Sequence, residues 1–539
     1  MALQIGRRDH NHVVYHMDHG EIFGDGDAPL SVEQVVENVL CRCRNTGINA
    51  LNLHITGATR HFLGIAEFEQ TKPPFKHLGH WNIYETIRHH RQNGTNLVEE
   101  IGKALRAQGI ALWAGLRVND IHHTTGKESA HPVFWSEHPE YRTNESVPWD
   151  HLRSTGALDF AHQAVRDNLR DQVEKTLELY DVHGFDLDFN RMAILFKSSE
   201  VDQHRDKVTE MLREIRTVVD AAAKRRGHPI YLEARVPSVA EQCRGMGADV
   251  LRWIEEEIIH VLTPSPHRFV EFEMPLGPFL EAAKGKETLI LAGLEGSQAD
   301  GVLSREMYRA WAYRYWKMGV DGLHLFNNCY NHILGGGLHP VDELHDPEWL
   351  AHLGKRYIVT RTLVGRGYSE ISDPMRSYPK QLPRTLELAK DRNGNGQTVT
   401  INVDDDLEAA QANDILESLT LRLRVMELTR HDKISIKVNG RDIPAECLRT
   451  RGSRWDHRQV AIPYAYAQPP WSEDTSGSYR WIFCDLSRDD YLHSGPNQVE
   501  VFLTEKNPDV LAPPLLYNVE VDVKYRDASH EGNRDMGRF

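Results

Sequence analysis

Residues 182–196, VHGFDLDFNRMAILF, decide how the rest of the chain is interpreted. Three apolar residues alternate here with three polar ones, namely Phe185, Leu187 and Phe189 with Asp186, Asp188 and Asn190. In an extended strand this alternation puts all three polar side chains on one face. Burying an unpaired charge costs on the order of several kcal/mol. The two carboxylates on that face therefore need either partners or a chemical role.

An amphipathic helix is predicted directly before this strand. Its apolar residues recur at helical spacing, at Val165, Leu169, Val173, Leu177 and Tyr180. His183 and Gly184 leave room for only a short turn between the helix and the strand. A helix that leads into a strand in this way is the repeating unit of a parallel α/β protein.

The same alternation of strands and helices extends over most of the chain. Short apolar segments predict strands at 12–17, 50–55, 111–118, 185–190, 229–236, 258–262, 288–294 and 322–326. Helical patterns lie between them at 31–40, where Ser31 and Gln34 form a capping box, and at 96–108, 200–225, 248–257 and 304–317. Eight strands over about 350 residues predict a (β/α)8 TIM barrel in 1–364. An open doubly wound sheet is the alternative, but no glycine-rich phosphate loop follows the first predicted strand.

The pattern changes after the predicted barrel. Residues 365–395 are rich in proline, glycine and charge, which is typical of a connector. Period-two strands are predicted at 398–403, 419–425, 434–438, 499–503 and 519–523, and Asn439-Gly440 is a strong turn signal. We expect 396–525 to form an antiparallel β-sandwich of jelly-roll type. The polar tail, 526–539, is expected to be disordered.

Bulk composition limits the partners and the location. The 539 residues carry a formal net charge of −15, which argues against nucleic acid or an anionic membrane as a partner. No apolar run approaches the roughly 20 residues of a membrane span, and residues 1–12 lack the apolar core of a secretory signal. We therefore predict a cytoplasmic protein with a neutral substrate and leave a homo-oligomer open. The six scattered cysteines give no support to structural zinc or a disulfide framework.

Polar residues gather at the carboxyl ends of the predicted barrel strands. The residues that alternation directs into the barrel are Asn52, His54, Arg117, Asn119, Asp186, Asp188, Asn190, Glu233, Arg235 and His324. Asp120, Arg191, Glu295 and Asn327 lie at or just beyond strand ends. Val, Ile and Leu usually fill a barrel interior, and active sites of such barrels lie at the carboxyl ends of the strands. The sequence thus predicts an active site there. The plainer interpretation is a buried network in which Arg117 or Arg235 neutralises Asp186 or Glu233.

Three carboxylates in this set are candidates for acid, base or nucleophile. Glycoside hydrolysis uses two carboxyl groups, roughly 5 Å apart for retention and 6.5–9.5 Å for inversion. We expect Asp188 and Glu295 to form this pair, with Glu233 as the competing member. Asp186 lies two residues deeper and is expected to orient a neighbour or pair with an arginine. The predicted substrate-binding residues are His54, Arg117, Asn119, Asp120, Asp186, Asn190, Arg191, Arg235, His324 and Asn327.

A second constellation is rich in histidine. It comprises His16, Asp18, His19, His54, His61, His122 and His123. Imidazole and carboxylate are ligands for Zn, Mn or Fe, but no H-x-H or H-E-x-x-H spacing appears at the carboxyl end of a strand. We therefore predict no cofactor and no metal. A metal-dependent sugar isomerase, epimerase or lyase stays an alternative.

Several motifs resemble a known group of enzymes. LDFAHQAVRD (158–167), YDVHGFDLDFNR (180–191), LRVNDIHH (116–123) and ARVPS (234–238) resemble the glycoside-hydrolase-like TIM barrels common in bacterial polysaccharide-degrading gene sets. The similarity spans about residues 15–328. It implies a barrel followed by a sandwich, and hydrolysis of an oligo- or polysaccharide-derived glycan.

The motif also departs from a related pattern. GFDLDFN looks like the strand-four motif of chitinases, DGxDxDxE, but the position of the acid glutamate is Asn190. An asparagine cannot donate a proton as a carboxylic acid does, so we do not expect a chitinase mechanism. The same feature motivates a third alternative, a noncatalytic glycan-binding barrel.

Overall fold

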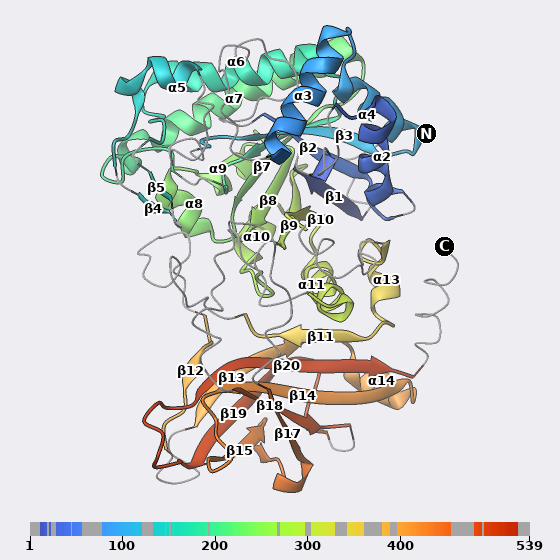
Figure 1. Cartoon of the computed structure of the whole chain (residues 1–539), viewed down its shortest axis with the longest axis vertical. Helices are drawn as coiled ribbons and strands as arrows, with labels where there is room; N and C mark the ends of the chain where they lie inside the picture. Colours follow the sequence, from blue (N-terminus) through green and yellow to red (C-terminus); the bar gives the residue numbers. More distant parts are fainter. Residues whose placement is uncertain are drawn as a thin grey trace.

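The computed structural model describes most of the chain (Figure 1). The described residues are 11–18, 21–22, 29–44, 46–56, 78–120, 133–145, 147–149, 152–154, 156–191, 194–266, 270–296, 303–328, 342–360, 380–388, 396–453, 479–487 and 490–526. Nearly all of the predicted tail and most of the predicted connector lie outside these ranges, so those two predictions stay untested.

Eight parallel strands of the described chain close into a barrel. In chain order they are β1 (His12–Met17), β2 (Ala50–Thr56), β3 (Ala111–Arg117), β6 (Gly184–Asp188), β7 (Tyr231–Pro237), β8 (Val261–Ser265), β9 (Leu289–Glu295) and β10 (Gly322–Phe326). Each strand pairs with the next, and β1 pairs with β10 to close the ring. The predicted (β/α)8 barrel is confirmed.

Helices cover the outside of the barrel (Figure 1). They include α2 (Val32–Cys43), α3 (Leu78–Gln92), α4 (Leu97–Ala107), α6 (Gln163–Leu179), α7 (Val201–Arg226), α8 (Ala240–Met246), α9 (Val250–Glu255), α10 (Gly277–Ala282) and α11 (Arg305–Met318). The predicted capping box is confirmed, because Ser31 Oγ accepts from Gln34 N while the Gln34 side chain accepts from Ser31 N. Helices α3, α8 and α10 were not predicted.

One predicted strand was misplaced. The strand expected at 258–262 is β8, Val261–Ser265. Ile258 and Ile259 are buried in the core that packs the helices against the barrel, and a buried connection is as apolar as a strand. Proline lacks the N–H that a strand ladder needs, so Pro264 argues against a strand at this position. The predicted strand therefore ended at 262, before the end of β8.

The lower half of the barrel interior is apolar. Its residues, from six strands, are Val14, Ala50, Ala111, Trp113, Tyr231, Val261, Leu289 and Leu291. The Trp113 indole is fully buried beside Gly184, where an added Cβ would overlap the ring. Glycine at 184 thus gives the indole the space to fill the floor of the barrel. Polar side chains can gather only above this floor, toward the carboxyl ends of the strands.

The C-terminal part is a sandwich of antiparallel sheets. One sheet contains β11 (Lys355–Ile358), β20 (Leu515–Tyr525), β14 (Leu416–Met426), β18 (Tyr479–Asp485) and β17 (Leu448–Ser453), with β12 (Arg384–Thr385) beside β20. The other contains β13 (Gln397–Val403), β19 (Gly495–Glu505), β15 (Lys433–Val438) and β16 (Arg441–Asp442). One hydrophobic core includes buried residues of both sheets, as the sequence predicts. Asn439 and Gly440, both at positive φ, form the predicted turn between β15 and β16.

The barrel and the sandwich meet at α11 and β11 (Figure 1). Ala310 of α11 belongs to the core of the sandwich. The buried Lys355 amine lies 2.7 Å from Asp405 Oδ1, and the Tyr357 hydroxyl donates to Asp405 Oδ2 at 2.7 Å. The range predicted for the barrel, 1–364, therefore includes one strand of the C-terminal sheet.

Candidate active site

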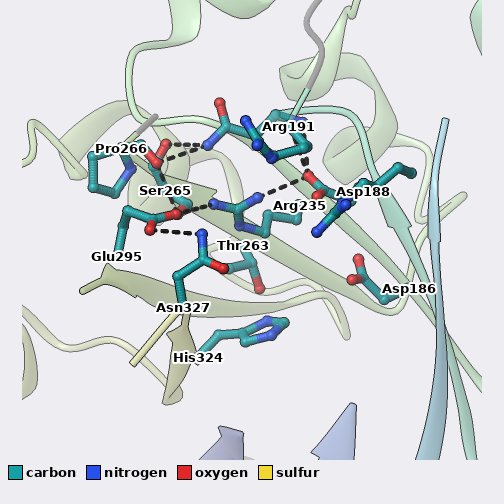
Figure 2. A network of polar contacts seen from close by, with 12 residues as sticks. Asp186, Asp188, Arg191, Arg235, Thr263, Ser265, Pro266, Glu295, His324 and Asn327 are labelled. Atoms are coloured by element: carbon teal, nitrogen blue, oxygen red, sulfur yellow. Dashed lines mark hydrogen bonds and ion pairs between the residues drawn. The ribbon is translucent and has the colours of Figure 1, made fainter. Parts of the chain in front are cut away.

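Arg235, on β7, connects two carboxylates at the carboxyl end of the barrel (Figure 2). Its Nη1 donates to Asp188 Oδ1 at 2.8 Å, and its Nη2 donates to Glu295 Oε2 at 3.1 Å. Nη2 also donates to Ser265 Oγ at 3.1 Å. All three charged side chains are at most 2% exposed. Because a buried charge is tolerated only when it is paired, this bridge allows two carboxylates to lie in the interior.

Asp188 uses its two oxygens differently. Oδ1 accepts the bond from Arg235 and two more from the backbone N–H groups of Asn190 and Arg191, at 3.0 and 2.9 Å. Oδ2 is buried and has no hydrogen-bond partner among the described residues. The carboxylate is thus fixed through one oxygen, and the other oxygen receives no hydrogen bond from the described residues.

Glu295 and Arg235 are held by the end of β10. Asn327 Nδ2 donates to Glu295 Oε1 at 2.8 Å, from a backbone with φ of 52°. The guanidinium carbon of Arg235 lies 3.4 Å from the centre of the Phe326 ring. The His16 ring stacks with Phe326 at 3.9 Å between centroids. Arg235, Phe326 and His16 therefore form a stacked column across the upper part of the barrel.

A second polar layer lies below this bridge, and Figure 2 shows Asp186 and His324 there. Asn52 Nδ2 donates to Asp186 Oδ2 at 2.7 Å. Glu233 Oε1 accepts from Thr263 Oγ1 at 2.5 Å and contacts His324 Nδ1 at 2.8 Å. Burial above all, and then the charges of Glu233 and Asp188, raise the pKa of Asp186 well above its usual value. This layer is a buried network in which the surroundings of Asp186 favour its neutral, protonated form.

The rim of the site contains the remaining predicted arginines. Arg117 Nη2 lies 3.2 Å from Asp18 Oδ2, and its Nη1 lies 3.7 Å from Asp120 Oδ2. Burial, followed by the nearby charge of Arg117, lowers the pKa of Arg191. The His54 ring lies 5.8 Å from the His16 ring, and burial lowers the pKa of His16 well below its usual value. The uncharged imidazole of His16 thus adjoins the charged rim.

Two asparagines predicted to bind substrate use their amide nitrogens within the fold. Asn190 Nδ2 donates to the carbonyls of Ser265 and Pro266, both at 2.9 Å. Asn119 Nδ2 donates to the carbonyls of Leu158 and Ile194, at 2.9 and 2.6 Å. These amides tie the ends of barrel strands to neighbouring segments.

Sequence reasoning left some participants out of the site. Ser265 and Thr263 were missed because the predicted sixth strand ended at 262, and Asn52 was placed inward but given no role. If the strand is extended to 265, alternation from Val261 points both hydroxyls inward. The sequence predicts Phe326 only as the end of a strand, and nothing in it indicates that an arginine stacks on this ring.

The histidine constellation is only partly described. His19, His61, His122 and His123 lie outside the described residues. Among the residues that are described, no group of three or more His, Cys, Asp or Glu is arranged to hold a metal ion. Within the same residues, no helix is long and apolar enough to cross a membrane.

Comparisons with known proteins give structural likeness only. No family model matches this sequence. No curated protein matches it either. Similar solved structures include a GH27 β-L-arabinopyranosidase from Geobacillus stearothermophilus, with 10% identity, a TM-score of 0.38, and 96% of this chain and 97% of that chain covered. An α-galactosidase from Thermus thermophilus has 13% identity and a TM-score of 0.37, with 64% of this chain and 63% of that chain covered.

A third similar structure is longer than this protein. It is a cycloisomaltooligosaccharide glucanotransferase from Paenibacillus sp., with 10% identity and a TM-score of 0.35. The match covers 94% of this chain and 57% of that enzyme. At this level of likeness none of these structures bears on which reaction the chain carries out.

Proposed function

We propose that the chain is a glycoside hydrolase in which Asp188 and Glu295 form the catalytic pair. The observation that supports this most is the state of Asp188. Three donors fix its Oδ1, while Oδ2 has no partner among the described residues. A carboxylate that is held by one oxygen and free at the other is suited to act as nucleophile or base.

The position of Glu295 supports its role as the second carboxylate. The bonds from Arg235 to the two acceptor oxygens are 2.8 and 3.1 Å long and start from one guanidinium group. Those oxygens therefore lie within about 8 Å of each other, which overlaps the roughly 5–9.5 Å at which glycosidases pair carboxyl groups. Glu233 is less suitable, because it lies in the layer below and is bound by Thr263 and His324.

The two carboxylates would divide the chemistry between them. Asp188 would attack the anomeric carbon or activate a water through Oδ2. Glu295, after releasing Arg235 and taking up a proton from solvent water, would give that proton to the leaving oxygen. Arg117, Asp120 and His54, at the rim, are the candidates to bind sugar hydroxyls. We propose an oligo- or polysaccharide-derived glycan without phosphate or sulfate as the substrate, because the chain is acidic overall.

The test is hydrolysis of a panel of aryl glycosides and natural oligosaccharides by the wild type and by matched variants. Asp188→Asn and Glu295→Gln should each lower kcat by roughly 10²- to 10⁴-fold, the usual contribution of an acid or base. Asp202→Asn, on a side chain that is 94% exposed, is the control and should keep full activity. Circular dichroism would show that every variant is folded.

Other outcomes would replace the proposal. Full activity of Asp188→Asn would exclude this carboxylate from the chemistry. Activity lost in EDTA and restored by a divalent ion would favour a metal-dependent isomerase, epimerase or lyase that uses the histidines. Glycan binding without turnover across the whole panel would favour a noncatalytic binding barrel.

A further inference from the structure

Two carboxyl groups lie side by side beneath the proposed catalytic pair. Asp186 on β6 and Glu233 on β7 are paired in register on neighbouring parallel strands, and both side chains point into the barrel. Asp186 Oδ2 accepts from Asn52, and Glu233 Oε1 is bound by Thr263 and His324. The other oxygens, Asp186 Oδ1 and Glu233 Oε2, are buried without a hydrogen-bond partner among the described residues. A carboxyl pair in which one oxygen of each member lacks a donor needs an explanation.

Asp186 and Glu233 are shielded from water, so solvent cannot stabilise a negative charge on both of them. Asp186 and Glu233 are at most 1% exposed. The apolar floor lies below them, and the column of Arg235, Phe326 and His16 crosses the barrel above. Neighbouring strands are about 4.8 Å apart, and two carboxyls sharing such a site cannot both ionise at ordinary pH.

We propose that Asp186 is a positioning residue that works in its protonated form and donates a hydrogen bond from Oδ1 to Oε2 of Glu233. A single proton satisfies both oxygens at once. We assign Glu233 as the ionised member because the Thr263 hydroxyl donates to it and the His324 ring contacts it, whereas Asp186 receives one amide bond. The raised pKa of Asp186 agrees with this assignment.

Every charged neighbour of the pair is otherwise engaged. On β6 itself, Asp188 is bound by Arg235, and on β7 Arg235 is shared between Asp188 and Glu295. His324, on β10, contacts Glu233, and His16, on β1, is kept uncharged by burial. Arg117, on β3, pairs with Asp18. In this arrangement the proton on Asp186 keeps a second negative charge out of the layer directly below Asp188.

Infrared spectroscopy tests the protonation without reference to any activity. The wild type at pH 7 should show the carbonyl band of a buried, protonated carboxylic acid, and Asp186→Asn should lack it. Asp188→Asn is the matched control, two residues away on the same strand, and should keep the band. Glu233→Gln should shift the band, because it changes the acceptor. A wild type without the band, or a wild-type spectrum identical in this region to that of Asp186→Asn, would overturn the proposal.

Thermal unfolding gives a second readout. A carboxyl whose pKa is raised in the folded state stabilises the fold at low pH and loses this contribution as pH rises through the folded pKa. An asparagine keeps the neutral donor at every pH. The Tm of Asp186→Asn relative to the wild type should therefore increase as pH rises above about 4, the usual carboxyl pKa. Parallel curves over the whole range would contradict the assignment.

The effect on turnover rests on the proposed function. Asp186→Asn preserves both hydrogen bonds and should stay within a few-fold of wild-type kcat, whereas Asp186→Ala loses both and should fall by about tenfold or more. A loss in Asp186→Asn as large as that in Asp188→Asn would mean that Asp186 takes part in the chemistry directly. If the wild type hydrolyses no glycan, the proposed function fails, while the infrared and unfolding results still decide the state of Asp186.

Discussion

The guanidinium of Arg235 lies over the ring of Phe326, with 3.4 Å between the guanidinium carbon and the ring centre. This contact fixes the plane of the arginine and so aims two of its nitrogens at Asp188 and Glu295. A buried cation over an aromatic ring gains about 2 kcal/mol. The stack therefore contributes to the placement of both proposed catalytic carboxylates.

Arg235→Lys should damage both stability and activity. A lysine keeps the charge but lacks the planar fork, so one ammonium cannot hold two carboxylates on different strands. We expect a loss of about 3 kcal/mol in the free energy of unfolding, the lower end for breaking a buried ion pair. Urea denaturation measures it. Arg235→Met should cost more, and a lysine variant as stable as the wild type would mean that the bridge is not needed.

Asn327 offers a way to separate a hydrogen bond from a backbone effect. It donates to Glu295 and has a φ of 52°, a conformation that glycine adopts freely and alanine does not. Asn327→Gly should lower kcat through Glu295 with little loss of stability. Asn327→Ala should show the same fall in kcat and lose about 1 kcal/mol more in unfolding free energy, the cost of the left-handed backbone. Equal kcat in glycine variant and wild type would show that this bond does not position Glu295.

Gly184→Ala should destabilise the floor of the barrel. The new methyl group would overlap the Trp113 indole, and overpacking of a core costs about 1–3 kcal/mol. Trp113→Leu in the same chain should relieve the overlap. The double variant is therefore expected to be more stable than the sum of the two single effects, as a double-mutant cycle would show. Additive effects would mean that the two residues do not compete for space.

His260 should make the fold sensitive to acid. Its Nδ1 accepts from the backbone N–H of Leu232 at 2.9 Å, so the ring is needed in its neutral form. Burial, with Arg216 adding to it, lowers the pKa of His260 to about 4. Between pH 6.5 and 4 the unfolded chain binds the extra proton, so the free energy of unfolding should fall as pH falls, by up to about 3 kcal/mol. His260→Gln should flatten this slope, and an unchanged slope would assign the acid sensitivity elsewhere.

The sequence allowed a good prediction of the fold and of which side chains face the barrel axis. Alternation around Asp186 and Asp188 requires only the two-residue period of a strand, and the same rule placed Glu233, Arg235 and His324 inward. Strand limits were less predictable where a proline interrupts the pattern, as Pro264 does in β8. The site was therefore predicted without its hydroxyl residues.

The pairing within the site could not be predicted from alternation. Alternation shows whether a side chain points into the barrel. It does not show how far along the barrel axis the polar end of that side chain lies. Arg235 is long enough to cross β8 and reach Glu295 on β9, so it bridges Asp188 and Glu295 instead of neutralising Asp186 or Glu233. That choice depends on the register between strands and on the Phe326 ring, which only the folded chain reveals.

The shared arginine has a consequence for how such a chain can change over generations. Loss of Asp188, Arg235 or Glu295 alone leaves at least one buried charge without its full set of partners, which is expected to destabilise the fold until a second replacement compensates. The three positions should therefore be inherited as a unit. We expect related proteins either to keep all three residues or to have neutral residues at all three positions. Few should have replaced only one or two of them.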